Sequence, residues 1–173
     1  QKTGCYNIGL GYQTLYGASA GTTGNYNTAF GYQAGKSLTS GGANNFFGTQ
    51  TGMNVITGTG NLYVGNSAGR CQCSGGYNIG LGYFALQGST TVSDNTGACN
   101  IAIGKCAGGG ITSGATNIMI GCDTGRLTTS GSNNILLGTN AGDAITTGSN
   151  LIAIGNGALS AEDTNTNGSI AIG

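Results

Sequence analysis

A nine-residue phrase that returns every 17 residues constrains this chain more than any other feature. Its clearest copies begin at Asn117, Asn134 and Leu151, and each joins an apolar segment, a glycine and a segment of small residues. The glycines that close the apolar segments are Gly11, Gly31, Gly48, Gly65, Gly82, Gly104, Gly121, Gly138, Gly155 and Gly173. The intervals between them are 20, 17, 17, 17, 22, 17, 17, 17 and 18 residues. Such a period predicts a solenoid, in which one repeat cannot bury its apolar face alone.

Each repeat has the pattern of a short strand between glycine corners. Counted from the closing glycine, position −1 is always large and apolar, and position −3 is usually branched. These two positions share one face of a strand because side chains alternate. Position +3 is small, and glycine recurs at +4 and +10, where a corner needs a residue that enters positive φ easily. The pattern predicts an all-β parallel β-solenoid of about nine coils, one domain over residues 1–173, with longer coils after Gly11 and Gly82.

Asparagine occupies position −4 in most coils. Asparagine tolerates the backbone conformations of corners, and stacked amide side chains can hydrogen-bond along a fibre axis. We therefore predict a structural asparagine ladder along the solenoid. Its members are Asn27, Asn44, Asn61, Asn78, Asn100, Asn117 and Asn134.

The longer coils share a second feature. Leucine replaces glycine at position +4 in Leu15, Leu86 and Leu159, and the intervals of these coils are 20, 22 and 18 residues. We expect this leucine to pack beneath an enlarged loop. Neither end of the sequence shows a capping repeat with a polar outer face, so we expect the natural chain to continue or its copies to stack end to end.

The residue types at position −2 indicate how many chains pack together. It should face away from −3 and −1, yet it is also apolar or small, with Phe46, Met119 and Leu136 among its larger residues. Fully buried strands have continuous apolar sequences, whereas one thin coil can cover only one face. We therefore expect the −2 face to pack against sister chains in a homotrimer. The alternative is a wider single-chain helix with an exposed apolar stripe.

Composition argues against several classes of function. Five basic and five acidic residues give a net charge of zero, so the clustered Lys and Arg of a nucleic-acid surface are missing. No apolar run approaches the ~20 residues that span a bilayer, so we expect no membrane insertion. With no histidine, a Ser-His pair and the usual zinc site are excluded. We expect no enzymatic activity, no metal and no cofactor.

Three sets of side chains stay open for chemistry. A glycosidase needs two carboxylates held across a bond, and the acids present are Asp94, Asp123, Asp143, Glu162 and Asp163. An exposed tyrosine beside an amide can contact carbohydrate, although packing against a neighbouring coil or chain explains the same residues. These candidate glycan contacts are Tyr12, Tyr32, Tyr83, Gln13 and Gln33. Cys106 and Cys122 lie in adjacent coils and are a candidate disulfide, with unpaired thiols as the alternative.

Three phrases carry a resemblance to known families: Asn27-Thr-Ala-Phe-Gly-Tyr-Gln-Ala-Gly35, Asn100-Ile-Ala-Ile-Gly104 and Ser169-Ile-Ala-Ile-Gly173. They resemble the head repeat of YadA-like trimeric autotransporter adhesins and the Asn-Thr-Ala-x-Gly-Tyr-Gln-Ala repeat of phage and virus tail fibres. The resemblance covers essentially the whole chain. It implies a homotrimer of left-handed parallel β-rolls that serves as an extended extracellular appendage.

The function that we expect from this resemblance is structural. The chain would be a rigid shaft or head segment of a virion tail or surface fibre that takes part in attachment to a host glycan or receptor. A bacterial cell-surface adhesin or extracellular filament subunit of the same roll is the first alternative. A polysaccharide-cleaving tailspike is the second.

Overall fold

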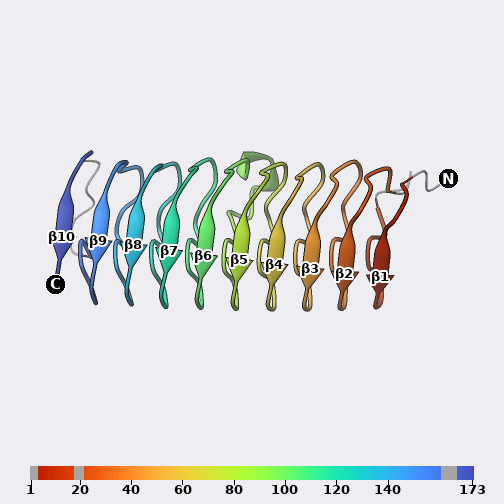
Figure 1. Cartoon of the computed structure of the whole chain (residues 1–173), viewed down its shortest axis with the longest axis horizontal. Helices are drawn as coiled ribbons and strands as arrows, with labels where there is room; N and C mark the ends of the chain where they lie inside the picture. Colours follow the sequence, from red (N-terminus) through yellow and green to blue (C-terminus); the bar gives the residue numbers. More distant parts are fainter. Residues whose placement is uncertain (1–3, 18–21, 161–166) are drawn as a thin grey trace.

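The computed structural model describes residues 4–17, 22–160 and 167–173, and these form a parallel β-solenoid (Figure 1). Each coil contributes one three-residue strand, and the ten strands form one sheet in sequence order. The strands are β1 Ile8–Leu10, β2 Thr28–Phe30, β3 Asn45–Phe47, β4 Leu62–Val64, β5 Ile79–Leu81, β6 Ile101–Ile103, β7 Ile118–Ile120, β8 Ile135–Leu137, β9 Ile152–Ile154 and β10 Ile170–Ile172. The predicted all-β parallel solenoid with a 17-residue period is confirmed.

Like positions of successive coils lie directly over one another. Between β6 and β7, for example, Ala102 pairs with Met119, and both occupy position −2. The longer coils keep this register, since β1 pairs with β2 and β5 with β6 at the same positions as in the short coils. The additional residues therefore do not shift the strands.

Position −2 fills the interior of the solenoid, and this corrects our expectation for the two strand faces. Phe46, Met119 and Leu136 are fully buried within one chain, where we expected them to contact sister chains. The coil closes on this side because small residues at position +3, such as Ala107 and Ala141, are buried in the same core. Positions −3 and −1 point outward, so the exposed apolar stripe is formed by the opposite face.

The closing glycine of each coil is required by its conformation and by its neighbour. Gly121 has φ +142°, which side-chain-bearing residues rarely adopt. A Cβ at Gly121 would also collide with the carbonyl oxygen of Gly138 in the next coil. By contrast, position +2 has φ near +55° and accepts larger residues such as Gln33 and Asp123.

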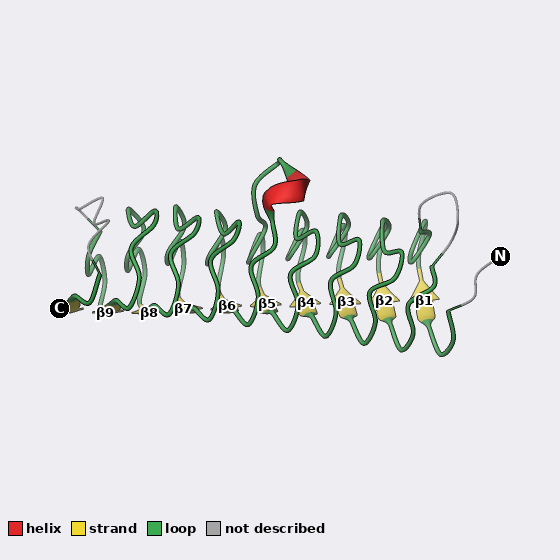
Figure 2. Cartoon of the chain, turned by 90° about the horizontal axis from the view of Figure 1, so that it is seen from above, coloured by secondary structure: helices red, strands yellow, loops and turns green. Residues whose placement is uncertain are grey.

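In the long coils after Gly11 and Gly82, the leucine at position +4 lies inside the core. Leu15 and Leu86 are almost fully buried, and each lies in a coil whose position −2 is glycine, so the leucine fills volume that the strand leaves empty. A Cβ added at Gly9 would touch the Leu15 side chain at 3.6 Å. The extra residues after Leu86 form a protruding loop with the 3₁₀ helix η1, Val92–Asp94 (red in Figure 2). Thus the long coil after Gly82 enlarges the outline of the solenoid, and the leucines at +4 keep its core continuous.

Candidate functional site

A column of buried asparagines runs along the solenoid from coil to coil, at the position just before each strand. In each of the seven predicted members, the backbone N–H donates to Oδ1 of the preceding asparagine at 2.9–3.0 Å. Each Nδ2 also donates to the carbonyl of a glycine 14 or 19 residues further along, at 2.8–3.0 Å. All seven side chains are buried, so these bonds satisfy polar groups that water cannot reach. The column therefore joins successive coils and holds the glycine corners in place.

One buried tyrosine is tied to this column. Tyr63 occupies position −2 in β4, and its hydroxyl donates to Oδ1 of Asn61 at 3.2 Å. Its ring stacks on Phe46 of β3, with centroids 5.8 Å apart. Burial raises the pKa of the Tyr63 phenol, which therefore stays protonated at neutral pH. The phenol thus acts as a structural donor inside the core.

The outward face of the sheet is the largest candidate interaction surface. It consists of positions −3 and −1 of the ten strands, and only Thr28 and Asn45 among these positions are polar. On inner strands the more exposed of these side chains, such as Ile103 and Ile120, still show 37–40% of their surface to solvent. Phe30 and Phe47 stack on this face with centroids 5.3 Å apart. The outward face is thus a continuous apolar stripe that runs along the solenoid.

Exposed tyrosines border the outward face at both ends of the strands. The predicted Tyr12, Tyr32 and Tyr83 each follow the closing glycine of their coil and are 46–63% exposed. Tyr12 and Tyr32 stack with centroids 5.5 Å apart, and the Nε2 of Gln33 donates to Oε1 of Gln13 at 2.8 Å. The tyrosines and glutamines proposed as glycan contacts on the first two coils therefore form one surface cluster, and the fifth coil repeats only its aromatic part.

A second tyrosine column precedes the strands and was not among the predicted contacts. Tyr6, Tyr26 and Tyr77 are 63–75% exposed, and Tyr6 stacks on Tyr26 with centroids 5.1 Å apart. The signal was present in the sequence, because the phrase Tyr-Asn-Ile-Gly-Leu-Gly-Tyr occurs at residues 6–12 and again at 77–83. Coils β1, β2 and β5 thus carry a tyrosine at each end of the strand.

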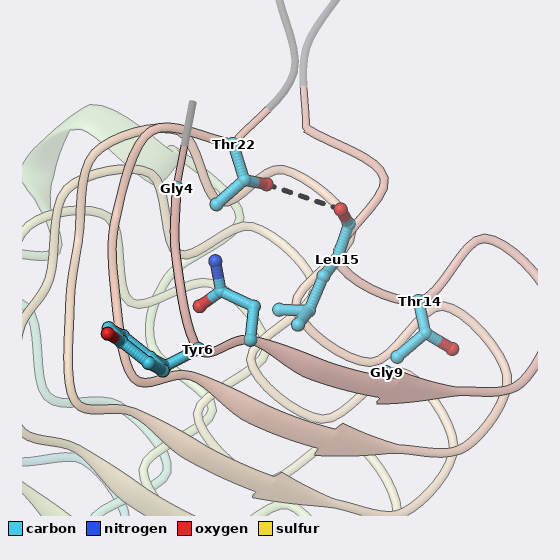
Figure 3. A pocket seen from close by; sticks show the side chains of 7 residues that line it. Gly4, Tyr6, Gly9, Thr14, Leu15 and Thr22 are labelled. Atoms are coloured by element: carbon cyan, nitrogen blue, oxygen red, sulfur yellow. Dashed lines mark hydrogen bonds between the residues drawn. The ribbon is translucent and has the colours of Figure 1, made fainter. Parts of the chain in front are cut away.

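A cavity of about 300 Å³ opens at the N-terminal mouth of the described solenoid (Figure 3). Its lining includes Gly9 and Leu15, which occupy inward positions, and Asn7, whose Oδ1 accepts from the backbone N–H of the first ladder residue, Asn27. The hydroxyl of Thr22 donates to the Leu15 carbonyl at 3.2 Å across its rim. Because inward positions line it, this cavity is continuous with the core of the described solenoid.

The two predicted disulfide partners lie beside one carboxylate. Cys106 and Cys122 are free thiols in the structure, and the Sγ of Cys122 lies 3.2 Å from Oδ2 of Asp123. Burial chiefly raises the pKa of the Cys106 thiol, and the hydrogen bond to Asp123 chiefly raises the pKa of Cys122. Both thiols are therefore neutral at neutral pH, and since the thiolate is the reactive form, disulfide formation is slowed. Their pairing stays a prediction.

The described carboxylates are separated in the fold. Asp123 lies at position +2 and forms a 3.8 Å ion pair with Arg126, while Asp143 lies at position +5 of the next coil. Asp94 ends the 3₁₀ helix of the long loop. Glu162 and Asp163 lie outside the described residues. Among residues that the structure describes, no group of three or more Cys, Asp or Glu is arranged to hold a metal ion, and no helix is long and apolar enough to span a membrane.

Comparison of the chain with protein-family models, with curated proteins and with solved structures finds no match. We therefore infer function from the geometry above and from the repeat pattern.

Proposed function

We propose that the chain is a rigid segment of an extracellular fibre of the virion tail or surface type, built as a parallel homotrimer and used in host attachment. The single observation that carries this proposal is the outward apolar face. The proposal includes the finer roll type that the sequence resembles, the left-handed trimeric β-roll of adhesin heads and tail fibres.

The size of the outward face supports association between copies. On five inner strands one outward side chain is 37–40% exposed and the other is half-buried, and the outward side chains of β1 and β10 are 58–76% exposed. Together the outward positions leave on the order of 1,000 Å² of apolar surface. A typical monomer exposes a largest apolar patch of roughly 300–600 Å², and a stable interface takes about 800 Å² from each partner. The face is therefore large enough for a stable interface, and identical copies offer the same straight apolar stripe to one another.

The interior supports a role as a spacer. Parallel strands, stacked asparagines and stacked aromatic rings repeat with every coil, so each coil is fixed by the one before it. At the usual strand spacing of about 4.8 Å, nine steps extend the segment by roughly 43 Å. Exposed tyrosines on the same coils would offer contact points for a host glycan.

The proposal is tested by the molar mass in solution, measured by light scattering after size exclusion. We expect about three times the 16.9 kDa of one chain. Ile120→Glu places a charge in the middle of the outward face and should convert the trimer to monomers with an unchanged far-UV spectrum, because an unpaired charge is costly to bury. Ser113→Glu, on an exposed corner, is the matched control and should stay trimeric.

A monomer for the unaltered chain at micromolar concentration would refute the assembly. A trimer that persists in Ile120→Glu would show that the outward face is not the interface. A bacterial adhesin would use the same face, and cell-surface rather than virion labelling with an antibody against the chain would favour that alternative.

A further inference from the structure

A notch opens on the flank of the solenoid between the coils of β5 and β7. It has a volume of about 250 Å³ and is lined by Phe84, Gln87, Cys106, Gly109, Gly110 and Arg126. The lining comes from three consecutive coils, so the notch exists only in the folded solenoid. It does not involve the outward face or the tyrosine clusters of the first two coils.

The notch exists because one coil lacks a side chain at position +5. Gln87 and Arg126 occupy this position in the coils on either side, whereas the middle coil has Gly109. Gly109 does not have a positive φ, and an added Cβ would lie 3.2 Å from the Cys106 carbonyl oxygen. The φ angle thus does not demand glycine there, although a side chain would require the Cys106 carbonyl to shift by a few tenths of an ångström. The missing side chain leaves the space between Gln87 and Arg126 open.

The lining contains one cation and no carboxylate. The Arg126 side chain is half exposed, and its Nε lies 3.8 Å from Oδ1 of Asp123, a long ion pair that leaves its terminal nitrogens able to donate further. The amide of Gln87 adds a neutral donor and acceptor, and the Phe84 ring adds an apolar wall. Burial raises the pKa of the Cys106 thiol, so this wall carries no charge at neutral pH.

We propose that this notch binds one carboxylate-bearing sugar residue of a surface glycan, which deepens the proposed role in host attachment and rests on it. Arginine pairs with a carboxylate through two parallel N–H donors, Gln87 bonds a hydroxyl, and the sugar ring packs against Phe84. The volume lies below the roughly 300–1,000 Å³ of pockets for drug-sized ligands, so it suits a single ring. Neither Asp123 nor Asp143 lines the notch, but Asp123 pairs with Arg126 and interacts with the Cys106 thiol, so the sugar carboxylate would compete with Asp123 for the guanidinium.

A single shallow site of this kind binds weakly, with a dissociation constant on the order of 1 mM. Several copies held in one fibre would strengthen attachment by avidity, since the second contact becomes intramolecular. Weak binding by one segment is therefore compatible with firm attachment by an assembled fibre.

The test is ligand-observed saturation-transfer NMR on the unaltered 173-residue chain, with sodium glucuronate as the probe and glucose as the uncharged counterpart. We expect transfer to glucuronate and little to glucose. Arg126→Gln should weaken glucuronate binding at least tenfold, since it removes the charge and keeps a polar side chain. Gly109→Gln should abolish it, because this side chain already stands at the same position in the preceding coil and fills the notch.

Lys36→Gln is the matched control, because it removes a cation from position +5 of a coil whose neighbours carry the side chains of Tyr16 and Met53 at that position, and it should leave binding unchanged. Equal binding of glucose, full binding by Arg126→Gln or no binding of glucuronate would each overturn the proposal. If Gly109→Gln does not fold, Arg126→Gln still decides the result. The molar mass of the same samples shows whether the trimer forms. Absence of glucuronate binding in a trimeric sample therefore contradicts the notch alone, and a monomer contradicts the proposed assembly.

Discussion

Replacing Asn44 by alanine tests the asparagine ladder against a control in the next residue. The Nδ2 of Asn44 donates to Oδ1 of Asn27 at 3.0 Å and to the Gly58 carbonyl at 2.8 Å. Its Oδ1 accepts from the backbone N–H of Asn61 at 3.0 Å. Alanine removes these bonds and leaves two buried backbone groups, the Gly58 carbonyl and the Asn61 N–H, without their partners.

The expected loss follows from those two groups. An unsatisfied buried donor or acceptor costs about 1–3 kcal/mol, so Asn44→Ala should lower the free energy of unfolding by about 2–6 kcal/mol. Asn45→Ala changes the same residue type on the outward face and should cost less than about 1 kcal/mol. Urea unfolding followed by circular dichroism at one fixed protein concentration compares the two variants.

Hydrogen exchange adds a reading at a single residue. The Asn61 amide should lose protection in Asn44→Ala and keep it in Asn45→Ala, because only the first substitution removes its acceptor. Equal destabilisation by the two substitutions, or a protected Asn61 amide in Asn44→Ala, would refute the reasoning.

Three further outcomes follow from the core and the corners. Gly121→Ala should prevent folding or cost more than about 4 kcal/mol, because it combines φ +142° with a collision in the next coil. Gly168→Ala, with φ +81° and no atom of the described residues within 4 Å of the added Cβ, should cost only about 1–2 kcal/mol, as thermal melting would show. Leu86→Ala should cost about 2–5 kcal/mol in urea unfolding, whereas exposed Leu127→Ala should cost less than about 1 kcal/mol. Burial raises the pKa of the Tyr63 phenol, so the contribution of the protonated phenol to stability is complete below the unfolded pKa of about 10 and is lost as pH rises above that value. The free energy of unfolding, measured from pH 9 to 12, should therefore fall less steeply in Tyr63→Phe than in the unaltered chain.

The repeat pattern predicted the fold because a solenoid depends on local periodicity. Spacing alone indicated parallel strands in register, and the asparagines at position −4 lie where that spacing put them. The leucines at +4 also marked the longer coils, although they take nearly the same left-handed backbone conformation, with φ from +46° to +54°, as the glycines they replace. Each of these features depends on residues within one coil or at matching positions of adjacent coils.

The sequence by itself determined that the strands have two apolar faces, and only the tertiary structure decided which face is the core. Alternation places Met119 opposite Ile118 and Ile120, but it does not say toward which side the chain turns. That choice is made by the corners, where the φ angles of Gly121 and Asp123 fold the coil over position −2. The notch at Gly109 likewise depends on side chains from neighbouring coils, because an empty position becomes a site only when its neighbours are stacked around it.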